Sequence, residues 1–146
     1  MQFISALSEK EFNIVFNEIY EISKFMSNQY PNFEYWFKEK VKKTIKEKEG
    51  DIIFYRKDEE IQGFVIVKNT KIEKKICTIY VKKEFRELNI GSKLIEEAIV
   101  YLGTLKPLIT IPEKNIDQFK YFIKRYNWVQ TSISYKYNTP EIIFNE

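Results

Sequence analysis

The segment that follows the apolar run Ile76–Val81 has the residue types of an anion-binding loop. Residues 82–92 read Lys-Lys-Glu-Phe-Arg-Glu-Leu-Asn-Ile-Gly-Ser and lead into a stretch with helical hydrophobic spacing. Asn89 and Gly91 are the residues most able to adopt a positive φ angle, which helps to direct successive amide N–H groups toward one point. Such groups at a helix N-terminus attract phosphate, and Arg86 adds a permanent cation. The alternative is a strand–turn–helix connection that binds no ligand.

The composition excludes several kinds of catalytic chemistry. The chain has no histidine, which removes Ser-His-Asp and Cys-His nucleophiles and imidazole-dependent zinc sites, and we expect no metal site. Its one cysteine allows no intramolecular disulfide. Because Cys77 lies within an apolar run, a buried and inert thiol is expected. Carboxylates, tyrosines, lysines, backbone dipoles or a bound cofactor must therefore do any chemistry.

The overall balance of residues is that of a globular protein. With 146 residues, 44% of them hydrophobic and 16% aromatic, we expect a single domain over residues 1–146. No apolar run approaches the roughly 20 residues that span a bilayer, and the first residues lack a basic leader segment. We therefore expect a cytoplasmic protein without a membrane partner. The lysines of residues 38–48 alternate with glutamates, which favours a solvated helix face and no nucleic-acid partner.

Hydrophobic spacing predicts the order of the elements. An early β-α-α segment leads into a three-stranded meander, a β-α-β unit, a helix and a terminal hairpin. This order predicts an α/β fold whose mixed, mostly antiparallel sheet has about seven strands, a central β-α-β unit and helices on both faces. The expected strands are 1–7, 51–55, 61–68, 76–81, 107–111, 128–137 and 142–145. Four helices are expected. The first follows the capping box Ser8–Glu11, and the second spans 33–45 with Gly50 as its C-terminal cap. The third spans 90–102 with Gly103 as its cap, and the fourth runs from Asn115 to Tyr126.

Several of these segments resemble one enzyme family. Arg86-x-x-Asn89-x-Gly91-Ser92 resembles the Arg/Gln-x-x-Gly-x-Gly/Ala pyrophosphate loop of the GNAT N-acetyltransferase superfamily, with Asn89 in place of the first glycine. The order of elements also resembles this family along the whole chain. Glu60–Val67 resembles the third strand of the family, and Ile79–Val81 resembles the end of its fourth strand. The segment from Asn115 through Trp128 resembles the family's Asn…Phe-Tyr-x-x-x-Gly-Phe region, with Asn127 in place of the glycine.

The resemblance implies a site for acetyl-CoA. In this family the fourth and fifth strands splay apart, and the pantetheine arm pairs with strand backbone in the gap. For Ile79 and Val81 a role in the strand core is compatible with this, and for Asn115 the alternative is a helix N-cap. The implied cofactor-binding residues are Ile79, Tyr80, Val81, Arg86, Glu87, Leu88, Asn89, Ile90, Gly91, Ser92 and Asn115.

The implied reaction is acetyl transfer by direct attack of an amine on the thioester, with a primary amine of a small molecule or peptide as the acceptor. An amine with a reference pKa of about 10.4 must first lose a proton. The thioester oxygen needs an N–H donor, which we expect near Val81. The base is unassigned, because Glu73 and Glu84 are near in sequence only.

The family protonates the departing thiolate with a tyrosine, and this chain departs from that pattern. The corresponding position is Ile123 or Phe122, depending on which end of the motif is aligned, and neither can donate a proton. Tyr126, on the helix face of Ile123, is the candidate general acid, and Tyr121 is the second choice. A core aromatic is the alternative for Tyr126.

The acceptor site is expected between the first two helices and the terminal hairpin. An aromatic cluster lies at the helix junction, although packing is the alternative role for most of it. A second class of function also stays open, namely a GNAT-fold protein that binds CoA or acyl-CoA without turnover. A homodimer through the terminal strands is a further option within the family. The cluster comprises Tyr30, Phe33, Tyr35, Trp36 and Phe37.

Overall fold

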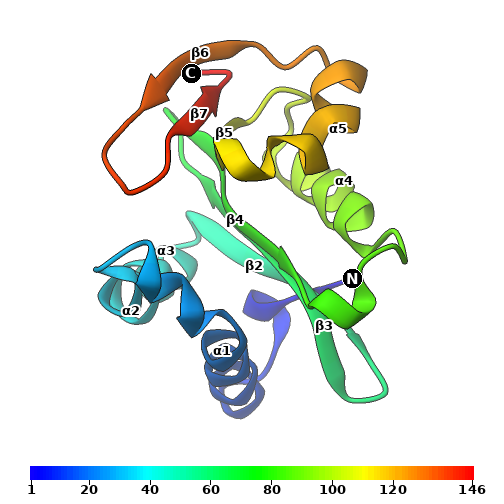
Figure 1. Ribbon diagram of the computed structural model, residues 1–146. Helices are drawn as coiled ribbons and strands as arrows, with labels where there is room; N and C mark the ends of the chain where they lie inside the picture. Colours follow the sequence, from blue (N-terminus) through cyan, green and yellow to red (C-terminus); the bar gives the residue numbers. More distant parts are fainter.

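Seven strands form one sheet in the computed structural model, which describes residues 1–146 (Figure 1). They are β1 (Gln2–Phe3), β2 (Gly50–Lys57), β3 (Glu60–Asn69), β4 (Lys74–Val81), β5 (Leu108–Pro112), β6 (Gln130–Ser134) and β7 (Glu141–Phe144). The strand order is β1-β2-β3-β4-β5-β7-β6, and every neighbouring pair is antiparallel except β4 and β5, which are parallel. The predicted α/β class and mixed sheet are confirmed.

Helices cover both faces of the sheet (Figure 1). On one face lie α1 (Glu9–Ser23), the 3-10 segment η2 (Lys24–Asn28), and a continuous helix made of α2 (Phe33–Tyr35), the π-helical segment η3 (Trp36–Val41) and α3 (Lys42–Lys46). On the other face lie α4 (Ile90–Leu102) and α5 (Lys120–Arg125), the latter preceded by the 3-10 segment η5 (Glu113–Phe119). Short 3-10 segments η1 (Ile4–Ala6) and η4 (Lys83–Phe85) follow β1 and β4. None of these helices has the length and apolar character needed to cross a membrane.

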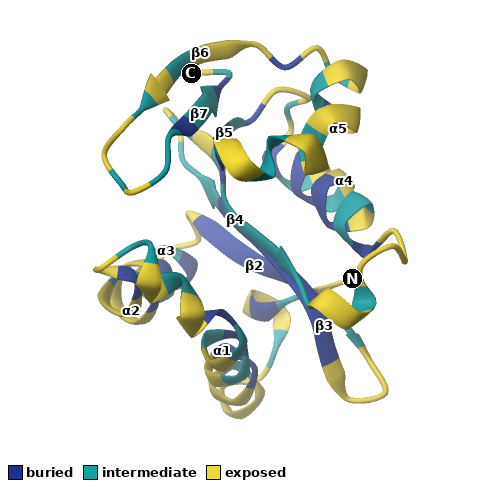
Figure 2. Ribbon diagram, in the orientation of Figure 1, coloured by how far each residue is buried: buried dark blue, intermediate teal, exposed yellow.

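The sheet separates two hydrophobic cores. One core joins α4 and α5 to the sheet through residues such as Leu94, Phe122 and Trp128. The other joins α1, α2 and η3 to the opposite face through residues such as Phe16 and Phe37. Figure 2 shows the consequence, since β2 and β3 are dark blue over most of their length while β4 is largely teal. The side chains of β4 are thus less completely covered by protein than those of β2 and β3.

Two predicted caps have different outcomes. The Oγ atom of Ser8 accepts a hydrogen bond from the Glu11 N–H at 3.2 Å, which confirms the helix start. Gly50 is not a helix cap, however, because it is the first residue of β2 and the left-handed residue after α3 is Lys48, with φ 61°. A Cβ atom on Gly50 would lie 2.4 Å from the Val67 carbonyl oxygen, so close approach to β3 requires the glycine.

The last helix also differs from its predicted form. It begins as the 3-10 segment η5 and becomes α-helical only at Lys120, so Asn115 lies inside η5 and is not the predicted N-cap. Asn127 follows α5 with φ 53°. This left-handed conformation is the one expected of a residue at the glycine position of the motif, and asparagine tolerates it better than most residues do.

Candidate active site

The parallel strands β4 and β5 separate soon after they pair. Only Lys75↔Leu108 and Ile76↔Ile109 are paired, so residues 77–81 of β4 and 110–112 of β5 have no partner across the gap. The separation coincides with a β-bulge, because Ile66 pairs with Thr78 and Val67 with Ile76, which leaves Cys77 as the extra residue. A bulge bends its strand, and here it directs the end of β4 away from β5.

The backbone of Ile79 and Val81 faces this gap. The Lys82 N–H donates to the Gln62 carbonyl at 2.9 Å, which makes that pair a hydrogen-bonded rung of the β3–β4 ladder. Rungs alternate in an antiparallel pair, so the backbone groups of Tyr80 also point toward β3. Those of Ile79 and Val81 point the opposite way, toward β5. Two of the three predicted strand residues thus offer backbone groups to the gap, while Tyr80 contributes its ring on the α1 side, 5.1 Å from the Phe25 centroid.

The loop between β4 and α4 presents unpaired amides. The backbone N–H groups of residues 87–92 make no hydrogen bond within the protein, and the first helical bond runs from the Lys93 N–H to the Asn89 carbonyl at 3.1 Å. No side chain caps α4, and its first turn has no acidic residue. Free amides and the positive end of the helix dipole therefore coincide at one point. The arrangement can bind a phosphate group.

The conformation of the loop agrees with the sequence expectation at one residue and differs at another. Asn89 is left-handed, with φ 62°, and Glu87 joins it, with φ 73°. Gly91 instead lies within α4 and does not have a positive φ. Gly91 leaves free space instead, because a Cβ atom there would have only the Val81 Cγ2 atom within 4 Å, at 3.8 Å. The surface of the first helical turn is thus open at Gly91, and a ligand can approach the backbone closely.

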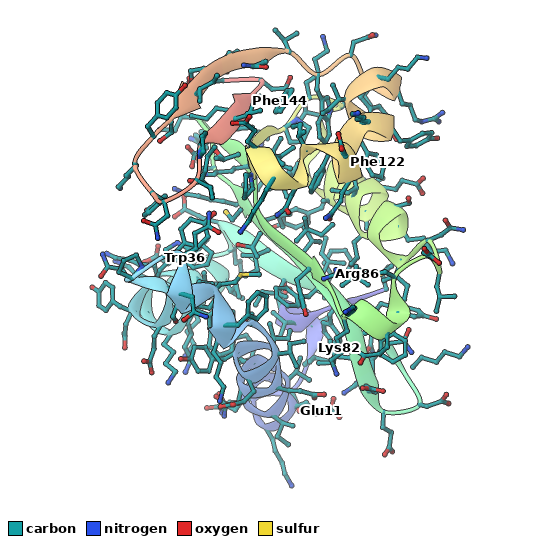
Figure 3. The ribbon with its side chains drawn as sticks, in the orientation of Figure 1. Glu11, Trp36, Lys82, Arg86, Phe122 and Phe144 are labelled. Atoms are coloured by element: carbon teal, nitrogen blue, oxygen red, sulfur yellow. The ribbon has the colours of Figure 1, made fainter.

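Arg86 lies at the end of β4. Its Nε donates to the Val81 carbonyl at 3.0 Å, and its guanidinium lies 5.8 Å from the centroid of the Tyr80 ring. Figure 3 shows Arg86 and Lys82 on the segment that joins β4 to α4. Over residues 82–93 the cations Lys82, Lys83, Arg86 and Lys93 outnumber Glu84 and Glu87. A polyanion would thus meet positive charge together with free amides.

The two candidate tyrosines differ in their surroundings. The Tyr126 ring stacks on Phe122 and Trp128 in the core beneath α4 and α5, with centroids 6.5 and 6.4 Å away. Since the Trp128 indole N–H donates to the Leu105 carbonyl at 2.9 Å, this cluster lies near the start of β5, where β4 and β5 are still paired. Tyr121 is 59% exposed. These contacts favour the packing role that the sequence left open for Tyr126.

The surroundings of three other side chains near β4 do not favour a base or a nucleophile. Glu73 pairs with Lys68 at 3.1 Å at the start of β4, and Glu84 is exposed. Burial raises the pKa of the Cys77 thiol to about 11, so the thiol stays protonated at neutral pH. The expectation of an inert cysteine agrees with this shift.

A buried carboxylate on the α1 face of the sheet was not predicted from the sequence. Glu141 opens β7 opposite Pro112 of β5 and is 5% exposed. The Tyr30 hydroxyl donates to its Oε2 atom at 2.5 Å, and the Tyr30 ring meets the Tyr137 ring edge-on at 4.8 Å. Glu141 belongs to a segment that looked like a turn, Asn138–Glu141. An acidic residue directly before the apolar pair Ile142-Ile143 was the only local sign of it.

The other aromatic residues of the helix junction are divided between the core and the surface. Phe33 and Phe37 are buried in the core on the α1 face, which is the packing role. Tyr35 is 59% exposed, and Trp36 is half-buried at the start of the π-helical segment. Tyr30 alone among them bonds to the terminal hairpin.

Comparison with known families identifies the chain. A family model described as acetyltransferase (GNAT) domain matches residues 20–132. This match spans most of the chain, so the chain belongs to the GNAT acetyltransferase family, a class of acetyl-transferring enzymes. No curated protein sequence matches it.

Solved structures share the fold. Nourseothricin acetyltransferase superposes with a TM-score of 0.56 at 14% identity, over 67% of this chain and 65% of that one, slightly less than two thirds of its length. A GNAT family acetyltransferase from Elizabethkingia anophelis, with acetyl-CoA bound, gives 0.55 at 20% identity over 73% and 80%. An IAA acetyltransferase from Bacillus cereus gives 0.57 at 14% identity over 72% and 81%. At these identities the likeness establishes the shared fold.

Proposed function

We propose that this chain is, over residues 1–146, one acetyl-CoA-dependent N-acetyltransferase domain that transfers the acetyl group to a primary amine of a small molecule or peptide. The observation that carries the proposal is the coincidence of two features at one end of β4. The backbone of Ile79 and Val81 is unpaired there, and the amides of residues 87–92 are free. An extended amide-bearing arm that ends in a diphosphate has complementary groups for both.

In this proposal the loop residues Arg86, Glu87, Leu88, Asn89, Ile90, Gly91 and Ser92 hold the diphosphate. Ile79 and Val81 pair with the pantetheine amides as an added strand would. The Asn115 side chain, half-buried and without a hydrogen bond of its own, is available to the same arm. Arg86 contributes its charge once it exchanges the Val81 carbonyl for phosphate oxygens, since a charge-assisted bond is the stronger one.

The main contribution of the protein to the reaction is to orient the amine and the thioester. Acetyl-CoA supplies an activated thioester, and a neutral amine attacks its carbonyl carbon while the oxygen gains negative charge. A free N–H at Ile79 or Val81 can donate to that oxygen. The C–S bond then breaks, the amine nitrogen loses its extra proton, and CoA leaves as the thiol. Orientation of the two substrates provides a large part of the rate enhancement in such reactions.

A thermal-shift titration with acetyl-CoA, CoA and ADP tests the cofactor site. Both CoA species should raise the melting temperature in a concentration-dependent way, because they bind the folded state. ADP lacks the pantetheine arm and should have a smaller effect at the same concentration. No shift with millimolar acetyl-CoA would contradict the proposed site.

A second function has one observation in its favour. The positions that correspond to the family's tyrosine are Ile123 and Phe122, which cannot donate a proton, and a GNAT-fold protein that binds CoA or acyl-CoA without turnover fits this departure. Release of CoA thiol across a panel of primary amines distinguishes the two functions. Turnover supports the enzyme, whereas tight CoA binding without turnover supports the silent binding protein.

The conservative variant Tyr126→Phe should retain thiol release within about twofold, because the ring serves packing and the variant keeps the ring. The rate should be measured at saturating acetyl-CoA with the best amine of the panel. General acids contribute on the order of 100-fold or more. A loss of that size at unchanged melting temperature would place the Tyr126 hydroxyl in the mechanism after all.

A further inference from the structure

Glu141 is a buried carboxylate beside the gap between β4 and β5. It pairs with Pro112, the last residue of β5, whose other edge is unpaired. The side chain points to the α1 face, because its partner Tyr30 follows η2 on that face. In the β4–β5 register Pro112 lies level with Ile79, since Ile76 pairs with Ile109. Glu141 thus lies one strand away from the expected path of the pantetheine arm.

This carboxylate has no cationic partner in the protein. None of the salt bridges of the structure includes Glu141. The neutral Tyr30 hydroxyl is its only hydrogen-bond donor, and Tyr30 in turn accepts from the Gln29 amide at 3.3 Å. Buried carboxylates are usually paired with a cation, because removal from water is costly for an unpaired charge.

One oxygen of Glu141 is free to bind a ligand. Oε2 accepts the Tyr30 bond, whereas no donor of the protein lies on Oε1. Every fully buried side-chain oxygen or nitrogen has a hydrogen-bond partner, so Oε1 must retain contact with solvent.

We propose that Glu141 is the binding residue for the ammonium group of the acceptor, so that this enzyme binds aliphatic amines in their protonated form, and the reacting nitrogen loses its proton before it attacks the thioester. This inference rests on the proposed acetyl transfer. The ammonium would supply the missing counter-ion at Oε1, on the α1 face of the sheet, while the thioester reaches the same gap from the α4 side.

The test compares amines with neutral counterparts of the same shape. Phenethylamine is paired with 2-phenylethanol, and 1,4-diaminobutane with butane-1,4-diol. Binding to the protein saturated with CoA is followed by calorimetry, and acetylation of the amines by release of CoA thiol. The wild type should bind at least one amine more tightly than its alcohol.

In Glu141→Gln the side chain keeps its shape and an oxygen for the Tyr30 bond but loses the charge. The preference for the amine should fall about 10- to 100-fold, as expected for the loss of a hydrogen bond to a charged group, with melting temperature and CoA affinity unchanged. Tyr30→Phe is the matched control, because it removes the latch between η2 and the hairpin and keeps the charge. It should lower the melting temperature and retain the preference within about threefold.

Two results would overturn the inference. One is a wild-type protein that binds neither amine better than its alcohol, and the other is a Glu141→Gln variant that keeps the wild-type preference. If the second result is found and Tyr30→Phe is destabilised, the hydrogen bond between Tyr30 and Glu141 only stabilises the fold. Failure of acetyl-CoA to bind the wild type is a separate result that contradicts the proposed function, and the CoA titration detects it before any amine is added.

Discussion

Replacement of Gly91 by valine should weaken acetyl-CoA binding about 100-fold while the protein stays folded. A Cβ atom at this position meets no protein atom closer than 3.8 Å, so the side chain has room. It would, however, cover the free amides at the first turn of α4, and each lost bond to a phosphate oxygen is worth roughly 1.5–3 kcal/mol. The affinity should be measured by calorimetry, and the melting temperature should be recorded without ligand.

Gly103→Ala is the matched control for this experiment. Gly103 ends the same helix with φ 69°, and a Cβ atom there would lie in open space. A left-handed alanine costs about 1–2 kcal/mol, so this variant should lose stability and keep its affinity for acetyl-CoA. Wild-type affinity in Gly91→Val would contradict the assignment of the loop, and equal losses of affinity in both variants would point to an effect of helix stability.

Gly50→Ala should lower the free energy of unfolding by about 3 kcal/mol, the upper part of the usual range for overpacking. The added Cβ atom would lie 2.4 Å from the Val67 carbonyl oxygen and 2.7 Å from the Thr44 Cγ2 atom. The first contact is with the backbone of the paired strand, which cannot move without disturbing β2 and β3 together. Thermal unfolding should show a decrease of roughly 10 °C.

Gly91→Ala provides the opposite result from the same chemical change. Gly91 is helical and unobstructed, and alanine is favoured over glycine in a helix by roughly 1 kcal/mol. The melting temperature should therefore stay the same or rise. A Gly50→Ala variant as stable as the wild type would contradict the close approach of the Val67 carbonyl to Gly50.

The sequence predicted those parts of the site that depend on neighbours along the chain. The β4–loop–α4 segment has short-range signals, including an apolar strand, an asparagine suited to φ > 0 and helical spacing after it, and Asn89 has that conformation. The alternation of residues along β4 likewise follows from strand geometry once β4 is recognised. The order of the elements then implies the parallel β4–β5 pair.

The remaining features arise from contacts between distant residues. The bulge at Cys77 depends on how β3 and β4 align, and the bond between Tyr30 and Glu141 joins residues 111 positions apart. Gly50 looked like a helix cap because its local sequence does not show the carbonyl of Val67 beside it. The last helix begins as a 3-10 segment, which its hydrophobic spacing did not show, and the Tyr126 ring stacks on Trp128.

The sheet that divides the two cores also has a kinetic consequence. If the cofactor enters from the face of α4 and the acceptor from the face of α1, the two ligands meet through the opening between β4 and β5 without competing for the same entrance. Both can then occupy the enzyme together, which predicts intersecting double-reciprocal plots rather than the parallel lines of a ping-pong cycle. A protonated Cys77 agrees with this expectation, because no acyl-enzyme is needed to carry the acetyl group between separate half-reactions.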